Sequence, residues 1–162
     1  MKQFQNSPLR KANQLFKTLA LGALLLSPLA QAKLDVMAHE PYARAMAPGA
    51  TTSAVFVTFA NRSQDDINIV AAETPAAGKV ELHDVIKDGD VMKMRQIDRI
   101  TLGAKETTEL KPGSLHIMLF DLKTPLNEGD EIEVTVTYDN GQKQRFNAPV
   151  KKVMAGMKHT AH

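Results

Sequence analysis

Hydrophobic and polar positions alternate along this chain in short runs, which is the pattern of β-strands rather than helices. Residues 132–138 alternate over seven positions, and residues 55–59 are rich in β-branched and aromatic side chains. Residues 115–120 are apolar on both faces, as a strand in the middle of a sandwich would be. Further strands are predicted at 67–70, 80–83, 91–97 and 145–150.

Turn-forming residues separate these runs. Gly, Pro, Asn and Asp gather at 47–49, 88–90, 111–114, 127–130 and 139–141. No stretch after residue 32 keeps a 3.6-residue period over three helical turns. Strands at intervals of about 8–12 residues, joined by such turns, predict an all-β fold: a single-domain, two-sheet β-sandwich.

The first 32 residues have the composition of a cleaved signal peptide. Four basic residues precede an apolar run at 19–26, and Ala-Gln-Ala at 30–32 is a small-x-small cleavage pattern. We expect cleavage after Ala32, export, and no stable membrane insertion of the mature chain, because the run is too short to span a bilayer. An N-terminal anchor or a buried helix is the alternative interpretation. No cysteine follows the run, which excludes a lipid attached at a cysteine.

Composition excludes several classes of function. The formal net charge of the whole chain is +2. The predicted signal peptide carries four basic residues and no acidic ones, so the mature chain has a net charge of −2. This charge, and the absence of a basic stripe in the mature sequence, argue against binding to nucleic acid. The absence of cysteine excludes disulfides, thiolate nucleophiles and a blue-copper electron-transfer site, which needs a cysteine ligand. No nucleophile elbow, H-E-x-x-H motif or phosphate-binding loop is present, so we do not expect an enzyme.

Two histidines and two methionines form the most distinctive chemical pattern. His116 and Met118 are two residues apart on a predicted strand and therefore share a face. His83 is expected to end a strand, after which a turn at 87–90 returns the chain so that Met94 lies near His83. Packing is the simpler explanation for any one of these residues taken alone. Together, soft thioethers and borderline imidazoles suit Cu(I), and suit Zn, Mg or Ca poorly.

The spacing of these four residues, H-x10-M-x21-H-x-M, resembles the signature of the periplasmic CuA chaperone family, PCu(A)C. The resemblance extends over about residues 35–150, including segments at 43–50, 57–61, 80–83, 110–113, 116–119 and 125–130. It implies a cupredoxin-like, Greek-key β-sandwich over residues 33–150. It also implies a solvent-accessible Cu(I) site formed by His83, Met94, His116 and Met118.

The resemblance further implies a periplasmic copper chaperone. Its acceptor would be the CuA centre in subunit II of cytochrome c oxidase, reached directly or with a Sco-type partner. Two alternatives stay open: a copper buffer without a dedicated acceptor, and a metal-free β-sandwich that acts as an interaction module.

Other methionines and histidines lie outside this signature. Met92 shares the predicted strand face of Met94, where it is either a reserve ligand or, the simpler interpretation, a packing residue. Met46 is left outside the predicted site. Residues 151–162 are polar and are expected to form a flexible tail after the last strand. An auxiliary copper site in this tail is the alternative to a simple disordered end, and its histidines would favour Cu(II). Its candidate ligands are Met154, Met157, His159 and His162.

Overall fold

The computed structural model describes residues 34–152, of which 36–151 lie in β-strands or in the connections between them. Within this range, no helix is long and apolar enough to cross a membrane. The predicted signal peptide and most of the predicted tail lie outside the described residues. The strands are β1 (Val36–Arg44), β2 (Thr52–Asn61), β3 (Ile67–Glu73), β4 (Ala77–Asp88), β5 (Val91–Gln96), β6 (Ile100–Leu102), β7 (Thr107–Leu110), β8 (His116–Leu122), β9 (Glu131–Tyr138) and β10 (Lys143–Lys151).

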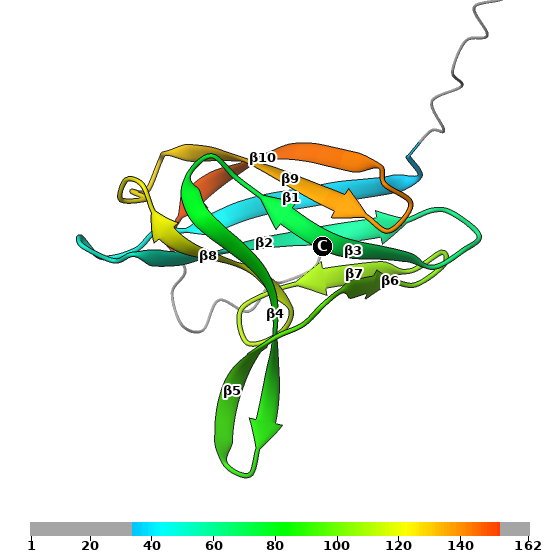
Figure 1. Cartoon of the computed structure of the whole chain (residues 1–162), viewed down its shortest axis with the longest axis horizontal. Coiled ribbons are helices and arrows are strands. Elements are labelled where there is room, and N and C mark those ends of the chain that lie inside the picture. Colours follow the sequence, from blue (N-terminus) through cyan, green and yellow to red (C-terminus); the bar gives the residue numbers. More distant parts are fainter. Residues whose placement is uncertain (1–33, 153–162) are drawn as a thin grey trace, which may run out of the picture. The chain divides into compact units, whose positions relative to one another are not determined.

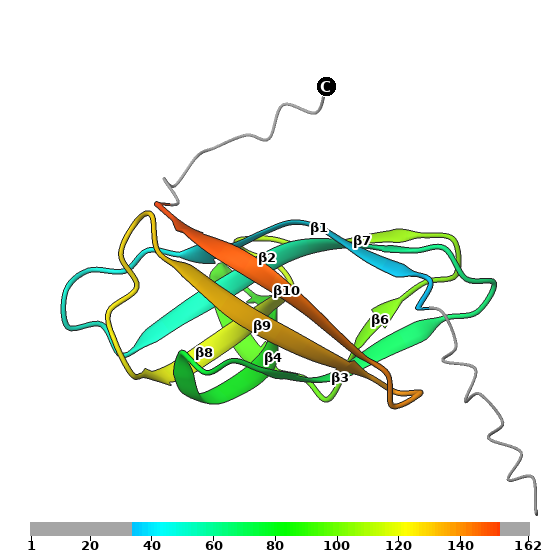
Figure 2. The ribbon, with the colours of Figure 1, turned by 90° about the horizontal axis from the view of Figure 1, so that it is seen from above.

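The strands form one hydrogen-bonded path in the order β5-β4-β8-β2-β1-β10-β9-β3-β6, and β7 pairs with β2. The path folds into two layers, which Figure 2 shows with β9 and β10 in front of β2 and β8. The layers are joined where β1 pairs antiparallel with β2 and parallel with β10, through Ala43 and Val150. The predicted all-β sandwich is therefore confirmed.

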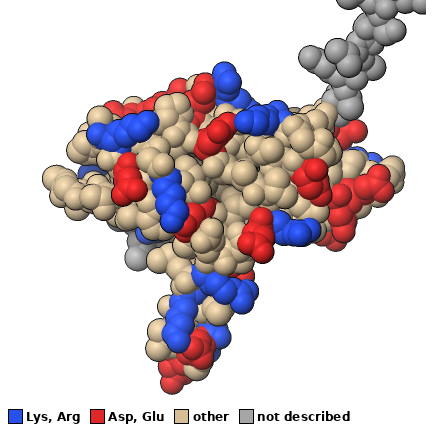
Figure 3. All heavy atoms as spheres, viewed as in Figure 1, with Lys and Arg blue, Asp and Glu red and all other residues tan. Residues whose placement is uncertain are grey.

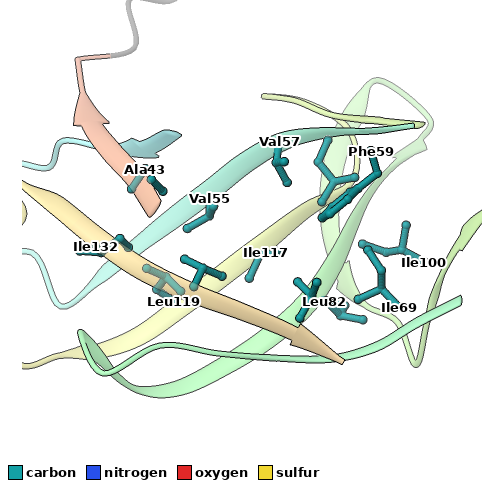
Figure 4. Packing of buried hydrophobic residues seen from close by; sticks show 14 of the residues in the cluster. Ala43, Val55, Val57, Phe59, Ile69, Leu82, Ile100, Ile117, Leu119 and Ile132 are labelled. Carbon is teal, nitrogen blue, oxygen red and sulfur yellow. The ribbon is translucent and has the colours of Figure 1, made fainter. Parts of the chain in front are cut away.

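The hydrophobic core lies between these two layers. Val55, Ile117 and Leu119 from one layer and Val134 and Val136 from the other are all fully buried. Figure 4 shows such side chains from facing strands packed against one another. With no cysteine in the chain, the fold depends on this apolar burial and on the pairing of the strands.

The seven predicted strands are all present, with bounds that differ from the predicted ones by up to five residues, and three strands were missed. β6 and β7 have only three and four residues, too few to show a clear alternation. β1 contains Glu40 at φ 48° and Pro41, and its register shifts between His39 and Tyr42, so its pattern is interrupted. His83 does not end a strand as predicted, since β4 continues to Asp88.

The outer half of β4 and all of β5 form a hairpin that extends beyond the two layers (Figure 1). A two-residue turn at Gly89 and Asp90 joins the strands, and Gly89 has a φ of 63°. β5 is at the end of the path and, of the described strands, hydrogen-bonds to β4 alone, and all six of its residues are exposed. Near the tip of the hairpin Lys93 forms an ion pair with Asp88, and Figure 3 shows basic and acidic side chains side by side there.

Candidate metal centre

His83 and His116 lie directly opposite each other on the antiparallel strands β4 and β8. The centroids of their rings are 5.6 Å apart. Their strand neighbours Leu82 and Ile117 also pair with each other, and both are buried in the core. Because side chains alternate across a strand, the two imidazoles project from the opposite, outer face of the same sheet.

Hydrogen bonding leaves one ring nitrogen of His116 available. Its Nδ1 lies 2.8 Å from the carbonyl oxygen of Ser114, so Nδ1–H donates and the lone pair remains on Nε2. The residue is only 4% exposed. Burial lowers the pKa of His116 below its ordinary value, against the opposing effect of the hydrogen bond to Ser114. The ring is therefore kept neutral, which is the form that binds a metal ion.

The turn that carries the Ser114 carbonyl is closed by its own backbone. Lys111 N–H donates to the carbonyl of Leu115 at 3.0 Å, and Ser114 N–H donates to the carbonyl of Lys111 at 3.1 Å. Gly113 adopts a φ of 79°, a conformation that glycine reaches without strain. The turn therefore fixes the acceptor that orients His116.

His83 is oriented by a carboxylate instead of a carbonyl. Its Nε2 lies 2.7 Å from Oε2 of Glu81, while its Nδ1 is buried with no hydrogen-bond partner in the described part of the chain. The hydrogen bond to His83, and then that to Lys79, lower the pKa of Glu81, so the carboxyl is ionised. Metal-binding histidines commonly donate one N–H to a carboxylate or a carbonyl and bind the metal through the other nitrogen. Both histidines of this pair have that arrangement.

Met94 and Met118 border the same region. Met118 pairs with Glu81 on one side and with Ala54 on the other. Met94 pairs with Val85, two residues beyond His83, and is 62% exposed. Both methionines and His116 line a surface cavity of about 120 Å³, which we call the hollow. Its wall also includes Arg44, Met46, Ser53, Phe56, Pro112 and Gly113.

The structure thus places the four residues of the signature close together. His116, Met94 and Met118 line the hollow, and the ring of His83 lies beside that of His116 at a tilt of 47°. Among residues 34–152, no group of three or more His, Asp or Glu side chains is placed to hold a metal ion. A metal ion held by the two histidines would therefore need the thioethers as further ligands. The candidate tail ligands Met154, Met157, His159 and His162 lie outside the described residues.

Arg44 and Phe56 also shape the hollow, and sequence reasoning missed both. The Arg44 guanidinium lies 5.7 Å from the centroid of the Phe56 ring, which is itself 6.3 Å from the His116 ring. Nε of Arg44 is buried with no hydrogen-bond partner within residues 34–152. Both residues reach the site from β1 and β2, far from the signature in sequence. A fixed positive charge beside the ligands disfavours ions of higher charge more than Cu(I).

Comparison with known proteins gives the family. The model of the LpqE-like family, described as lipoproteins, matches residues 36–150. The chain belongs to the LpqE-like family. Solved structures similar to this LpqE-like chain include PCuAC domains, and the resemblance to PCu(A)C predicted from the sequence is confirmed.

Individual relatives vary in how much they share with this LpqE-like chain. The uncharacterised protein RP573 of Rickettsia prowazekii is 33% identical over 101 residues, which are 62% of this chain and 56% of that protein. The chain thus spans little more than half the length of that relative. The copper-bound PCuAC domain from PmoF2 has a TM-score of 0.63 at 18% identity, over 74% of this chain and 94% of that domain. The Cu(I) form of DR1885 from Deinococcus radiodurans has a TM-score of 0.61 at 29% identity, over 76% and 82%.

Proposed function

We propose that this LpqE-like chain is a carrier of Cu(I) and that His83, Met94, His116 and Met118 hold the ion. One observation supports this most directly. The two imidazoles lie opposite each other on β4 and β8, and each has one ring nitrogen hydrogen-bonded to an oxygen, while the other has no hydrogen-bond partner among residues 34–152. The two thioethers lie on the same outer face of the sheet. No catalytic step is needed for this role.

The kind of ligand favours Cu(I) over other metals. Thioether sulfur is a soft, neutral donor, and Cu(I) is the soft ion among those commonly bound by proteins. Two neutral thioethers and two neutral imidazoles leave the +1 charge of the ion uncompensated, and the Arg44 guanidinium adds a further positive charge nearby. A Cu(II) ion would meet greater repulsion at the same place. The Deinococcus radiodurans protein, 29% identical, was solved with Cu(I), which supports the assignment.

The position of Met94 suits a carrier that gives up its copper. The residue is 62% exposed on a hairpin strand that pairs with only one of the other described strands. A ligand from an acceptor protein can therefore approach the ion from the Met94 side while His116, which is buried, still holds it. We propose the CuA centre in subunit II of cytochrome c oxidase as the acceptor, reached directly or through a Sco-type protein in the periplasm. The description of the family as lipoproteins supports a location in the cell envelope.

The first test is anaerobic titration of the purified protein with Cu(I), followed by X-ray absorption. We expect one copper ion with two sulfur ligands and one or two nitrogen ligands. Replacement of both His83 and His116 by Ala should abolish loading. His39→Ala is the matched control, because His39 is exposed on β1 and does not line the hollow. Copper bound with only oxygen and nitrogen neighbours would contradict the assignment.

The second test concerns the acceptor. A strain that lacks the protein should lose cytochrome c oxidase activity when copper is scarce, and added copper should restore it. Sensitivity to high copper with normal oxidase activity would instead show that the protein buffers copper, and would contradict delivery while leaving the copper site intact.

A further inference from the structure

Of the methionines in the described part of the chain, three line the hollow, and Met46 is the one that the signature does not contain. It follows β1 in the connection to β2, more than forty residues before Met94. Its backbone is held in place, since Met46 N–H donates to the carbonyl of Leu126 at 3.3 Å and Ala45 N–H donates to that of Lys151 at 2.8 Å. Met46 therefore presents its thioether from a segment fixed to the body of the sandwich.

Met94 presents its thioether from a different kind of support. Within residues 34–152, β5 is hydrogen-bonded to β4 alone, and all six of its residues are exposed. Segments with few buried contacts and one bonded neighbour open at a lower free-energy cost than the core strands. Of the thioethers around the hollow, Met94 is thus the one most easily withdrawn, and Met46 and Met118 remain when it leaves.

We propose that Met46 is a reserve ligand that binds Cu(I) in the position vacated by Met94. This inference rests on the proposed function. In the exchange a Cu–S bond to Met94 breaks and a Cu–S bond to Met46 forms. The copper stays Cu(I), and no proton or electron moves. His116, Met118 and Met46 then keep the ion in the hollow, while the side that Met94 covered is open to an acceptor's ligand.

Met92 is the rival for the same role. It lies two residues from Met94 on the same face of β5 and is 57% exposed, so it does not pack as the sequence predicted. However, Met92 does not line the hollow, and it would leave together with Met94 if the hairpin moved. It therefore provides a matched control of the same residue type on the same strand.

The test compares Met94→Leu with the double variants Met94→Leu/Met46→Leu and Met94→Leu/Met92→Leu. Leu is close to Met in volume, so packing is largely conserved. Cu(I) affinity is measured by competition with a chromophoric chelator under anaerobic conditions. Loss of Met46 in the Met94→Leu background should weaken binding by about tenfold or more, the scale on which groups around a metal site act. Loss of Met92 in that background should change it little.

X-ray absorption and NMR give readouts that do not depend on affinity. Met94→Leu should still show two sulfur ligands, and the double variant without Met46 should show one. The methyl resonance of Met46 should shift on loading of Met94→Leu with Cu(I), and that of Met37, exposed on β1 away from the hollow, should not.

Two other outcomes are distinguishable. In the first, wild-type protein binds Cu(I), but the copper in Met94→Leu has only one sulfur ligand, or loss of Met92 rather than Met46 weakens the remaining Cu(I) binding. The reserve role of Met46 is then wrong, and the proposed function stands. If wild-type protein binds no Cu(I), the proposed function fails, and this inference fails with it.

Discussion

Replacing Glu81 by Ala should weaken Cu(I) binding although Glu81 is not a proposed ligand. Its Oε2 accepts a hydrogen bond of 2.7 Å from Nε2 of His83, and this bond leaves the lone pair of the ring on the buried Nδ1. Without the carboxylate, the proton can move to Nδ1 and the ring can rotate. Nδ1 would then no longer be ready to bind the metal.

The structure sets the size of the effect. The side chains of Glu81 and His83 are only 10% and 12% exposed, so water replaces the lost acceptor poorly. Loss of an outer partner of a metal-binding histidine typically reduces metal affinity by about 10–100-fold, and we expect a change in that range. Glu81→Gln keeps an oxygen acceptor and should lose less. Lys79→Ala is the control, because Lys79 is 61% exposed and its ion pair with Glu81 contributes little.

Two measurements check this reasoning. Chelator competition gives the Cu(I) affinity of each variant, and long-range ¹⁵N NMR of the apo protein gives the tautomer of each histidine. We expect hydrogen on Nε2 of His83 and on Nδ1 of His116 in the wild type, with only His83 altered in Glu81→Ala. Unchanged Cu(I) affinity in Glu81→Ala, with the His83 tautomer altered, would show that His83 is not a ligand. An unaltered tautomer would refute the role of Glu81.

Three further predictions concern stability and the turn beside the site. Gly113→Ala and Gly141→Ala both force a side chain into a left-handed φ, of 79° and 81°, and each should lower stability by about 1–2 kcal/mol in urea unfolding. Only Gly113→Ala should also weaken Cu(I) binding, and equal effects of the two variants on copper would contradict the role of the turn. Leu119→Ala leaves a cavity at a fully buried core position and should lower the free energy of unfolding by about 2–5 kcal/mol in the same assay. A smaller loss would show that neighbouring core side chains move in to fill the cavity. Because the folded-state pKa of His116 lies below 6.5, the unfolded chain binds the proton more readily, and stability should fall as pH drops below about 6.5. His116→Asn should remove this part of the pH dependence. If the urea midpoint of this variant changes with pH as that of the wild type does, His116 is not the source.

Local pattern was sufficient for most strands of the fold. The alternation at residues 132–138 and the apolar run at 115–120 each follow from one strand's position relative to the core, so they can be read without knowing its neighbours. β6 and β7 are too short to show a period. The pattern of β1 is broken by its irregular register, and the strand is held by pairing with β2 and β10, which are distant in sequence.

The candidate site divides in the same way. That His116 and Met118 share a face follows from their spacing on one strand, and the kinds of ligand predict Cu(I) without any coordinates. Tertiary pairing of β4 with β8 alone decided that His83 lies opposite His116. The end of β1 and the connection that follows it likewise bring Arg44 and Met46, respectively, to the hollow. The physical reason is that the period of a strand determines which way a side chain points, whereas its neighbours across the sheet depend on contacts between segments far apart along the chain.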